Sequence, residues 1–363
     1  MKQGWEIKKI KDICDKASSN IAQNKITELD GDYPVFGASG FVQNVDFYHR
    51  DTEYIGIVKD GSGVGRVNTY PAYSSLLGTL QYIIPKEGYL LNYVSYALKS
   101  LNLSEYASGA AIPHIYFKDY GKAVISVPPM EEQEKIVEEL DCLSGVIEKK
   151  REQLKELDAL AESIFYTMFG DPEHSKYEIV ALREIAAEIG DGLHGTPQYD
   201  DCGDCYFING NNLIDGKIEI SNTTKKVNSD TKQKYFISLT NRSILVSING
   251  TLGKTAYYNG ENVILGKSAC YISLKNDVSK EYVYFLLGSK YFKTYASNNA
   301  TGSTIRNVSL KSMREFPIPL PPNDLQVNFV AKIALIEKQK QLIKESIAQT
   351  EELFNSRMAY YFN

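Results

Sequence analysis

The stretch TGSTIRNVSLKSMREFPIPLPPNDLQ, residues 301–326, repeats the stretch SGAAIPHIYFKDYGKAVISVPPMEEQ, residues 108–133. Under a shift of 193 residues, a glycine, an isoleucine, a proline pair and a glutamine keep their places. The matched residues are Gly109 with Gly302, Ile112 with Ile305, Pro128 and Pro129 with Pro321 and Pro322, and Gln133 with Gln326. The chain therefore contains one junction twice, and a long stretch of helical character follows each copy.

The repeat continues outside this junction. WEIKKIKDIC (5–14) resembles YEIVALREIA (177–186), and KDGSGVGRV (59–67) resembles INGTLGKTA (248–256), with Gly65 over Gly253 and Arg66 over Lys254. LQYII around Tyr82 likewise matches the stretch ACYIS. Because the period is about 170 to 190 residues and a solenoid repeats every 20 to 50, the sequence indicates a domain duplication.

Each half begins with about 120 residues of short β-branched runs separated by glycine-containing turns, which is typical of strands. After each proline pair, apolar residues follow the alternating three-and-four spacing of a coiled-coil seam. The seam of the first helix comprises Ile136, Leu140, Leu143, Ile147, Leu154, Leu157, Ala161, Ile164 and Met168, with Lys150 as its polar break. The seam of the second comprises Phe329, Ile333, Ile336, Ile343, Ile347 and Phe354, with Lys340 and Thr350 as its breaks.

We therefore predict an α+β fold with two tandem mixed α/β modules, each followed by a long helix. The predicted boundaries are 1–128 for the first module, 129–170 for its helix, 171–320 for the second module and 321–363 for its helix. The length and regularity of the seams favour an antiparallel coiled coil with pseudo-twofold symmetry. The alternative is that each helix packs only on its own module.

Charge is unevenly distributed along the chain. The net charge is −5 over 363 residues, yet the segment 131–173 carries 13 acidic and five basic residues, which leaves the rest at +3. An acidic whole chain therefore does not exclude DNA contact by the modules. We find no signal peptide and no apolar run long enough for a membrane span, so we expect a cytoplasmic protein.

The motifs of autonomous enzymes are missing from the sequence. We find no phosphate-binding G-x-x-x-x-G-K-[ST] loop, and the proline pairs lack the amide and aromatic neighbours of adenine methyltransferases. Cys202 and Cys205 form a C-x-x-C in the run DDCGDC, but only His194 lies near as a further zinc ligand. A glycine-rich turn is the alternative to a metal site there. We therefore predict no catalytic residues, no metal and no cofactor.

The run DGLHGTP (191–197) completes a family resemblance. A duplicated module with a [ST]-G-x-x-I junction, a proline pair and a long helix resembles the specificity (S) subunit of type I restriction–modification enzymes. DGLHGTP resembles the D-G-x-H-x-T-P opening of many target-recognition domains in that family. The first module has SSNIAQN (18–24) instead, so we expect the two modules to recognise different sequences and the target to be asymmetric.

The resemblance implies a non-catalytic subunit that reads a bipartite site in double-stranded DNA. Each target-recognition domain would read one half-site, and the helices would set the spacer between the half-sites. Two modification subunits, which methylate adenine, would dock on this chain, and the resemblance also implies restriction subunits that translocate DNA. The alternatives are the specificity subunit of a related methylase system, or a coiled-coil scaffold that does not read DNA.

Candidate DNA-binding residues come from three kinds of loop. The glycine loops could contact phosphates, or could be hairpin turns with solvated charges. The DGLHGTP residues could contact DNA or order their own loop, and the junction residues could face DNA or form a hinge between module and helix. The predicted set is Lys59, Ser62, Gly63, Arg66, His114, His194, Thr196, Asn249, Thr251, Lys254 and Arg306.

Overall fold

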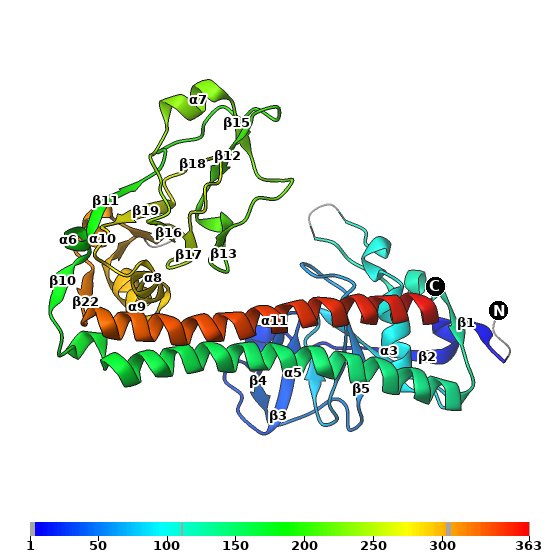
Figure 1. Cartoon of the computed structure of the whole chain (residues 1–363). Helices are drawn as coiled ribbons and strands as arrows, with labels where there is room; N and C mark the ends of the chain where they lie inside the picture. The colour runs from blue at the N-terminus through cyan, green and yellow to red at the C-terminus, as the bar shows by residue number, and fades with distance from the viewer. Residues whose placement is uncertain (1–3, 110–111, 303–305, 363) are drawn as a thin grey trace. The chain divides into compact units, whose positions relative to one another are not determined.

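The chain divides into two units that share one order of elements. Unit 1 comprises Met1–Gln153 and Ile343–Asn363, and unit 2 comprises Leu154–Leu342. The computed structural model describes residues 4–109, 112–302 and 306–362, and Figure 1 shows their helices and strands. The globular part of unit 1, from β1 (Glu6–Lys9) to β9 (Val124–Val127), is called domain 1, and that of unit 2, from β10 (Ile179–Ala181) to β22 (Pro317–Pro319), domain 2.

Domain 1 contains a four-stranded antiparallel sheet in the order β2-β8-β5-β6. A three-stranded sheet, β4-β3-β7, adds one antiparallel and one parallel pairing, and β1 pairs with β9. The strands are β2 (Cys14–Ser18), β3 (Tyr33–Gly37), β4 (Gly40–Val45), β5 (Tyr54–Val58), β6 (Val67–Tyr70), β7 (Ser75–Leu76) and β8 (Leu80–Pro85). The helices are α1 (Ile10–Ile13), α2 (Gln23–Ile26), α3 (Leu91–Ser100), the 3-10 helix η1 (Leu103–Tyr106) and α4 (Phe117–Tyr120).

Domain 2 repeats this topology and adds to it. Its four-stranded sheet has the order β11-β19-β16-β17, its three-stranded sheet has the order β15-β12-β18, and β10 pairs with β22. The shared strands are β11 (Ala186–Asp191), β12 (Cys205–Ile208), β15 (Lys226–Val227), β16 (Ser243–Ser247), β17 (Thr255–Tyr257), β18 (Val263–Leu265) and β19 (Ala269–Leu274). Two further pairs are β13 (Leu213–Ile214) with β14 (Lys217–Ile218), and β20 (Ala300–Thr301) with β21 (Asn307–Val308). The helices are α6 (Leu182–Ile185), the 3-10 helix η3 (Gly210–Asn212), α7 (Ser229–Lys234), α8 (Lys280–Gly288), α9 (Lys290–Asn299) and α10 (Leu310–Arg314), and the 3-10 helix η2 (Pro172–His174) precedes the domain.

One of the two inner strands of each four-stranded sheet, β5 in domain 1 and β16 in domain 2, explains why these sequences form a core. β5 has the sequence YIGIV and β16 the sequence SILVS, and every residue of both strands is buried. Such runs lack the polar alternation of a half-exposed strand because both faces of the sheet are covered. The matched strands β5 and β16 therefore lie in the hydrophobic cores of their domains.

Two helices of 40 residues follow the domains, α5 (Met130–Phe169) and α11 (Asn323–Phe362). At 1.5 Å per residue, each is about 60 Å long. Every residue of the two predicted seams, including the three polar breaks, is buried or half-buried, whereas most of their neighbours are exposed. The periodicity thus correctly identified the face of each helix that packs.

Within each unit, α5 and α11 run antiparallel (Figure 1). In unit 1, Glu139 pairs with Arg357 and Arg151 with Glu351. In unit 2, Lys340 forms an ion pair with Asp158, 2.7 Å away. Partner numbers fall along α11 as they rise along α5, which confirms the predicted pairing and the α+β fold class with two tandem modules.

The domains pack onto the long helices through one equivalent helix in each. Tyr93 of α3 clusters with Ile136 and Leu140 of α5, and Tyr282 of α8 lies in the same core cluster as Phe329 of α11. The two tyrosines also make equivalent hydrogen bonds. Tyr93 donates to the carbonyl of Ser126 at 2.6 Å, and Tyr282 donates to the carbonyl of Pro319 at 2.8 Å.

Candidate nucleic-acid interface

The glycine loop of domain 1 connects β5 to β6 and turns through three glycines. Gly61, Gly63 and Gly65 have φ angles of +82°, +87° and +87°. A Cβ at Gly65 would come within 2.6 Å of the Ser104 amide nitrogen. All three positions favour glycine because other residues rarely adopt this backbone conformation, and at Gly65 the neighbouring backbone also leaves no space for a side chain.

Domain 2 has the equivalent loop between β16 and β17. Gly250 and Gly253 have φ angles of +76° and +77°. The amide of Gly253 donates to the carbonyl of Ser247, as the amide of Gly65 donates to the carbonyl of Val58. Both glycine loops are thus hairpin turns, which was one of the two interpretations given to them in the sequence analysis. The candidate DNA-binding side chains of these loops lie on the turns.

The junction segments are hydrogen-bonded to these glycine loops in both domains. In domain 1, Gly61 N–H donates to the Pro113 carbonyl at 3.0 Å, and the amide after His114 donates to the carbonyl of Lys59 at 2.9 Å. In domain 2, Gly250 N–H donates to the Arg306 carbonyl at 3.0 Å, and Val308 N–H donates to the carbonyl before Asn249 at 2.8 Å. Each junction is therefore joined to the glycine loop of its own domain by two backbone hydrogen bonds. Ile305 of the repeated junction lies outside the described residues.

A third segment, which the sequence analysis missed, lies on the other side of each glycine loop. The amide of Lys59 donates to the carbonyl of Thr79 at 3.0 Å, and the amide of Ile248 donates to the carbonyl of Ser268 at 3.1 Å. Thr79 and Ser268 directly precede the matched strands around Tyr82 and Tyr271. Extending that match by a few residues toward the N-terminus would have identified both segments.

The third segment in turn joins the loop that contains DGLHGTP in domain 2. Lys267 N–H donates to the Leu193 carbonyl at 3.0 Å, and in domain 1 Gly78 N–H donates to the Ile21 carbonyl at 2.8 Å. Four segments therefore lie side by side in each domain, and we call them the loop row. In domain 1 it comprises residues 19–22, 77–79, 59–66 and 108–115, and in domain 2 residues 192–196, 266–268, 248–254 and 301–308, apart from 110–111 and 303–305.

All the predicted DNA-binding residues lie in the two loop rows. Lys59, Ser62, Gly63, Arg66 and His114 belong to that of domain 1. His194, Thr196, Asn249, Thr251, Lys254 and Arg306 belong to that of domain 2. Residues far apart in sequence are thus brought together twice, in the same arrangement.

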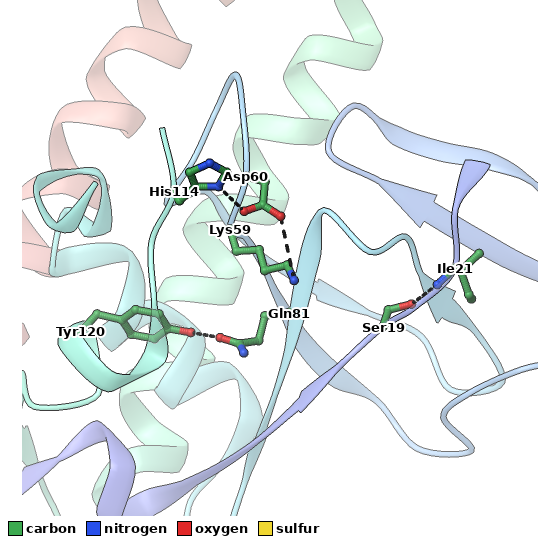
Figure 2. A network of polar contacts seen from close by, with 7 residues as sticks. All are labelled: Ser19, Ile21, Lys59, Asp60, Gln81, His114 and Tyr120. Carbon is green, nitrogen blue, oxygen red and sulfur yellow. Dashed lines mark hydrogen bonds and ion pairs between the residues drawn. The ribbon is translucent and has the colours of Figure 1, made fainter. Parts of the chain in front are cut away.

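Several of these side chains hold the loop row in place. Figure 2 shows Asp60 between His114 and Lys59: its carboxylate accepts from His114 Nδ1 at 2.7 Å and lies 3.9 Å from Lys59 Nζ. Arg66 donates from Nε to the carbonyl of Gly63 at 3.2 Å, so this guanidinium is folded over its own loop. The contacts of Asp60 and of Arg66 therefore both stabilise the glycine loop.

Beneath the row in domain 1, a second polar contact ties α4 to the central sheet. The Tyr120 hydroxyl donates to Gln81 Oε1 at 2.7 Å (Figure 2). Burial raises the pKa of Tyr120 above its ordinary value, since the charged phenolate would lose its hydration. This tyrosine therefore stays a neutral hydrogen-bond donor that supports the loops above it.

His194 orders its own loop. Its Nε2 is 2.7 Å from the carboxylate of Asp191, whereas its side chain remains 70% exposed. A Cβ on Gly192 would come within 1.9 Å of the Leu265 carbonyl oxygen, so this glycine allows the loop to approach β18. The interaction with Asp191 matches the loop-ordering alternative, while the exposed ring and the exposed Thr196 stay candidates for DNA contact.

Exposed cations accompany the loop row of domain 2. Lys267 is exposed, as is Arg306, whose Nη1 donates to the hydroxyl of Ser297 at 3.3 Å. Lys254 is half-buried and follows the positive-φ Gly253. Cations and backbone amides on neighbouring loops are the groups that bind DNA phosphates.

The C-x-x-C run forms a turn around one aspartate. The amide of Cys202 donates to the Asp200 carboxylate at 3.0 Å, and Gly203 N–H donates to the Asp200 carbonyl at 2.9 Å. Cys205 is buried, which raises the pKa of its thiol. Within the described part of the chain, no group of three or more His, Cys, Asp or Glu side chains could hold a metal ion.

In the same part, no helix has the length and apolarity that crossing a membrane requires.

Comparisons with known proteins match this architecture. The family model described as "Type I restriction modification DNA specificity domain" matches residues 2–159 and again residues 175–352. The type I restriction enzyme MjaVIII specificity subunit of Methanocaldococcus jannaschii is 22% identical over 391 aligned positions, which cover 96% of this chain and 90% of that protein. The MjaIX specificity subunit of the same organism is 27% identical over 213 residues, about half of each protein (52% and 49%).

A solved structure has the same fold. The S subunit of a type I restriction–modification system from M. genitalium aligns with a TM-score of 0.58 and 16% identity, over 99% of this chain and 96% of that one. The family model matches twice and covers nearly the whole chain, each match containing one loop row. The chain therefore belongs to the type I restriction–modification DNA specificity family and carries two copies of its domain.

Proposed function

We propose that this protein is the DNA sequence-recognition subunit of a type I restriction–modification enzyme. The observation that carries the proposal is the loop row, which both domains build with equivalent backbone hydrogen bonds and different side chains. Two such rows suit a bipartite target, and their different side chains suit an asymmetric one.

The proposed domains follow the predicted boundaries. Residues 1–128 and 171–320 would be the target-recognition domains, and residues 129–170 and 321–363 the helical spacers. Both long helices continue from one unit into the other, which supports a role in setting the spacer between half-sites. The proposed DNA contacts are the predicted residues of the loop rows, together with Lys267.

The proposed partners are double-stranded DNA, two modification subunits and the restriction subunits of the same system, in the cytoplasm. Methyl transfer would belong to the modification subunits, and this chain would have no catalytic group, metal or cofactor of its own. Methyl transfer to DNA from labelled S-adenosylmethionine by the isolated chain would contradict this division of labour.

The central experiment is co-purification with a modification subunit followed by mapping of methylated adenines. We expect a bipartite, asymmetric target. Replacing residues 15–105 with the corresponding part of another recognition domain should change one half-site and leave the other intact. A complex that binds its modification subunit and shows no DNA sequence preference would favour the scaffold alternative.

The loop row itself is tested by a charge variant in the same complex. Lys254→Ala should weaken DNA binding and reduce the slope of log K against log salt by about one, since one phosphate contact is lost. Lys338→Ala removes an equal charge from an exposed position of α11 and should leave the slope unchanged. Equal effects of the two variants would show that Lys254 contributes only to net charge.

The spacer is tested by lengthening both helices. Four residues inserted after Leu154 and four after Ile343 add about 6 Å to each helix and nearly preserve the helical phase. Since base pairs rise about 3.4 Å, the half-sites should move apart by about one to two base pairs. An active complex with an unchanged spacer would show that the helices do not set it.

A further inference from the structure

We infer that two matched side-chain pairs, Asp60–His114 in domain 1 and Asn249–Asn307 in domain 2, determine which base each domain accepts at one position of its half-site. The inference rests on the proposed function and names specificity-determining residues within it. Domain 1 would select cytosine through hydrogen-bond acceptors, and domain 2 would select adenine through an amide.

The two pairs occupy the same place in the loop row. Asp60 and Asn249 hold equivalent positions in their glycine loops. The residue before each accepts a backbone hydrogen bond from the junction, and the glycine after each donates one to the junction. His114 and Asn307 lie directly opposite them, in isolated antiparallel bridges. The backbone around the pairs is therefore equivalent, and the side chains are the part that differs.

A second set of bonds fixes the junction side of each pair. The amide of His114 donates to the Ser108 carbonyl at 2.8 Å, and Asn307 pairs with Thr301 between β21 and β20. The hydroxyls of Ser108 and Thr301 also bond to the carbonyls of His114 and Asn307, at 3.5 and 3.4 Å. Because the main chain is held on both sides, exchanging the pairs changes the chemistry of the surface without moving the loops.

The pair of domain 1 offers acceptors. His114 Nδ1 donates to the Asp60 carboxylate, which leaves Nε2 as an acceptor in the neutral ring. The carboxylate keeps further lone pairs, and the two side chains are 32% and 38% exposed. In the major groove, the amino group of cytosine is the donor that pairs with aspartate.

The pair of domain 2 offers an acceptor and donors together. Asn249 Nδ2 donates to Asn307 Oδ1 at 3.3 Å. The side-chain oxygen of Asn249 and the side-chain NH₂ group of Asn307 therefore remain available for further hydrogen bonds. Adenine presents one acceptor and one donor side by side in the major groove, and asparagine is the side chain that matches both.

A phosphate-binding role would not account for this difference. A carboxylate repels the DNA backbone, and Asp60 lies in the row between Lys59 and His114 (Figure 2). The ammonium of Lys59 and the Nδ1–H of His114 reduce that repulsion, whereas the acceptor chemistry of Asp60 suits a base edge. The amide pair at the matched place carries no charge, so the two sites differ in hydrogen-bond chemistry where their backbones agree.

The test exchanges the pairs in the complex with the modification subunit. The variant Asp60→Asn with His114→Asn gives domain 1 the amides of domain 2, and Asn249→Asp with Asn307→His makes the reverse exchange. Bound sequences are selected from duplexes with randomised half-sites. Each exchange should shift the preference by about tenfold at one base pair of its own half-site, toward adenine in the first variant and toward cytosine in the second. The other half-site should not change.

Two further variants separate base reading from loop stability. Asp60→Asn alone keeps an acceptor for His114 Nδ1 and should weaken the cytosine preference in a folded protein. Tyr120→Phe removes the hydrogen bond to Gln81 beneath the row and should lower the melting temperature without changing the selected sequence.

The exchange variants retaining both wild-type base preferences would overturn the inference. So would a folded exchange variant that loses affinity equally for every half-site sequence, because the pair would then act on affinity alone. A wild-type complex that selects no bipartite sequence would contradict the proposed function instead, which distinguishes the two failures.

Discussion

Domain 1 and domain 2 have the same topology but surround their loop rows differently. In domain 1, a pocket of about 790 Å³ lies beside the row, lined by residues 20–23, 37–42 and 77–79. In domain 2, the residue matched to Leu77 is Gly266, and the side chains of Asn209 and Phe207 pack against it. Domain 2 also carries α7, α9 and the β13–β14 hairpin. The backbone that positions the row has thus been kept, while the surface around it has diverged.

The attachment to the long helices also differs. In unit 2, Phe329 lies 5.7 Å from Phe165, 5.3 Å from Phe169 and 5.0 Å from Phe285, measured between ring centroids. The residue matched to Phe329 in unit 1 is Ile136, which packs beside Tyr93. The same position on the two long helices can therefore be filled by an aromatic cluster or by an aliphatic residue while the domain stays packed on its helix. The following predictions test how far the two units are equivalent.

The largest expected effect is the loss of the aromatic cluster. Phe329→Ala removes a fully buried ring and should cost about 3–5 kcal/mol in the free energy of unfolding, against about 2–4 kcal/mol for the matched Ile136→Ala. Urea denaturation of the full chain measures both. If Ile136→Ala costs as much as Phe329→Ala, the aromatic contacts add nothing beyond burial.

The two glutamines at the same place in the repeated junction, Gln133 and Gln326, should contribute unequally to the free energy of unfolding. Gln133 Nε2 donates to the carbonyls of Pro128 and Gly88, and its Oε1 accepts from Leu90 N–H at 3.0 Å. Gln326 donates to the Pro321 carbonyl at 2.8 Å, and its buried Oε1 has no hydrogen-bond partner among the described residues.

We therefore expect Gln133→Ala to cost about 2–3 kcal/mol and Gln326→Ala about 1 kcal/mol or less. The second variant removes an unsatisfied buried oxygen along with one bond, which offsets part of the loss. Thermal denaturation of the two variants measures the difference. Equal losses would mean that both glutamines contribute mainly through their apolar stems.

The matched tyrosines should behave alike. Tyr93→Phe and Tyr282→Phe each remove one hydrogen bond to an equivalent carbonyl and preserve the packing of the ring. Each should cost about 1 kcal/mol. The measurement is the urea midpoint of each variant against wild type. A loss in one unit alone would show that the two helix attachments differ in more than their apolar contacts.

The smallest effect concerns acid. Hydrogen bonds from Arg357, assisted by Tyr361, outweigh partial burial and lower the pKa of Glu139. Because this pKa is lower in the folded than in the unfolded chain, the stabilisation is present above the ordinary value of about 4.3 and is lost as pH falls below it. The pair is about one-third exposed, so its contribution should be under about 1 kcal/mol.

Hydrogen exchange measures this effect locally. Protection factors, which correct for the intrinsic exchange rate at each pH, should be lower in the last turns of α11 at pH 3 than at pH 6, and Glu139→Gln should remove that difference. Under the repeat, Lys332 replaces Glu139. IEKKREQL (147–154) matches IEKQKQLI (336–343) at a shift of 189 residues, so Met168 replaces Arg357; unit 2 therefore lacks this Glu–Arg pair and offers an internal control. Equal acid sensitivity at the matched turns would assign the effect to another carboxylate.

Much of the fold could be predicted from the sequence because its signals are local or repeated. The seam spacing identified the buried faces of both long helices, since the periodicity of an α-helix fixes which residues share a face. The same reasoning placed Lys150 and Lys340 on the seam, where each contacts the facing helix: Lys150 donates to Ser346, and Lys340 pairs with Asp158. The repeated junction likewise identified two equivalent modules.

The candidate site was predicted as separate loops, and only the tertiary structure joined them. Nothing in the spacing between Lys59 and His114 reveals that a carboxylate between them binds both, because sheet pairing brings distant segments together without a local signal. An extended sequence match could have located Thr79 and Ser268, but not their role, because their backbone carbonyls, and not their side chains, bridge the row.

The duplication, the order of domain and helix, and the two seams can all be recognised in the amino-acid sequence, because each depends on the pattern of side chains along one segment. The tertiary structure alone decided that four segments form one row in each domain, and that Asp60 faces His114 where Asn249 faces Asn307. Backbone N–H and C=O groups are the same in nearly every residue, so hydrogen bonds between them leave no pattern in the sequence. The pairing of remote loops can therefore be seen only in the folded chain.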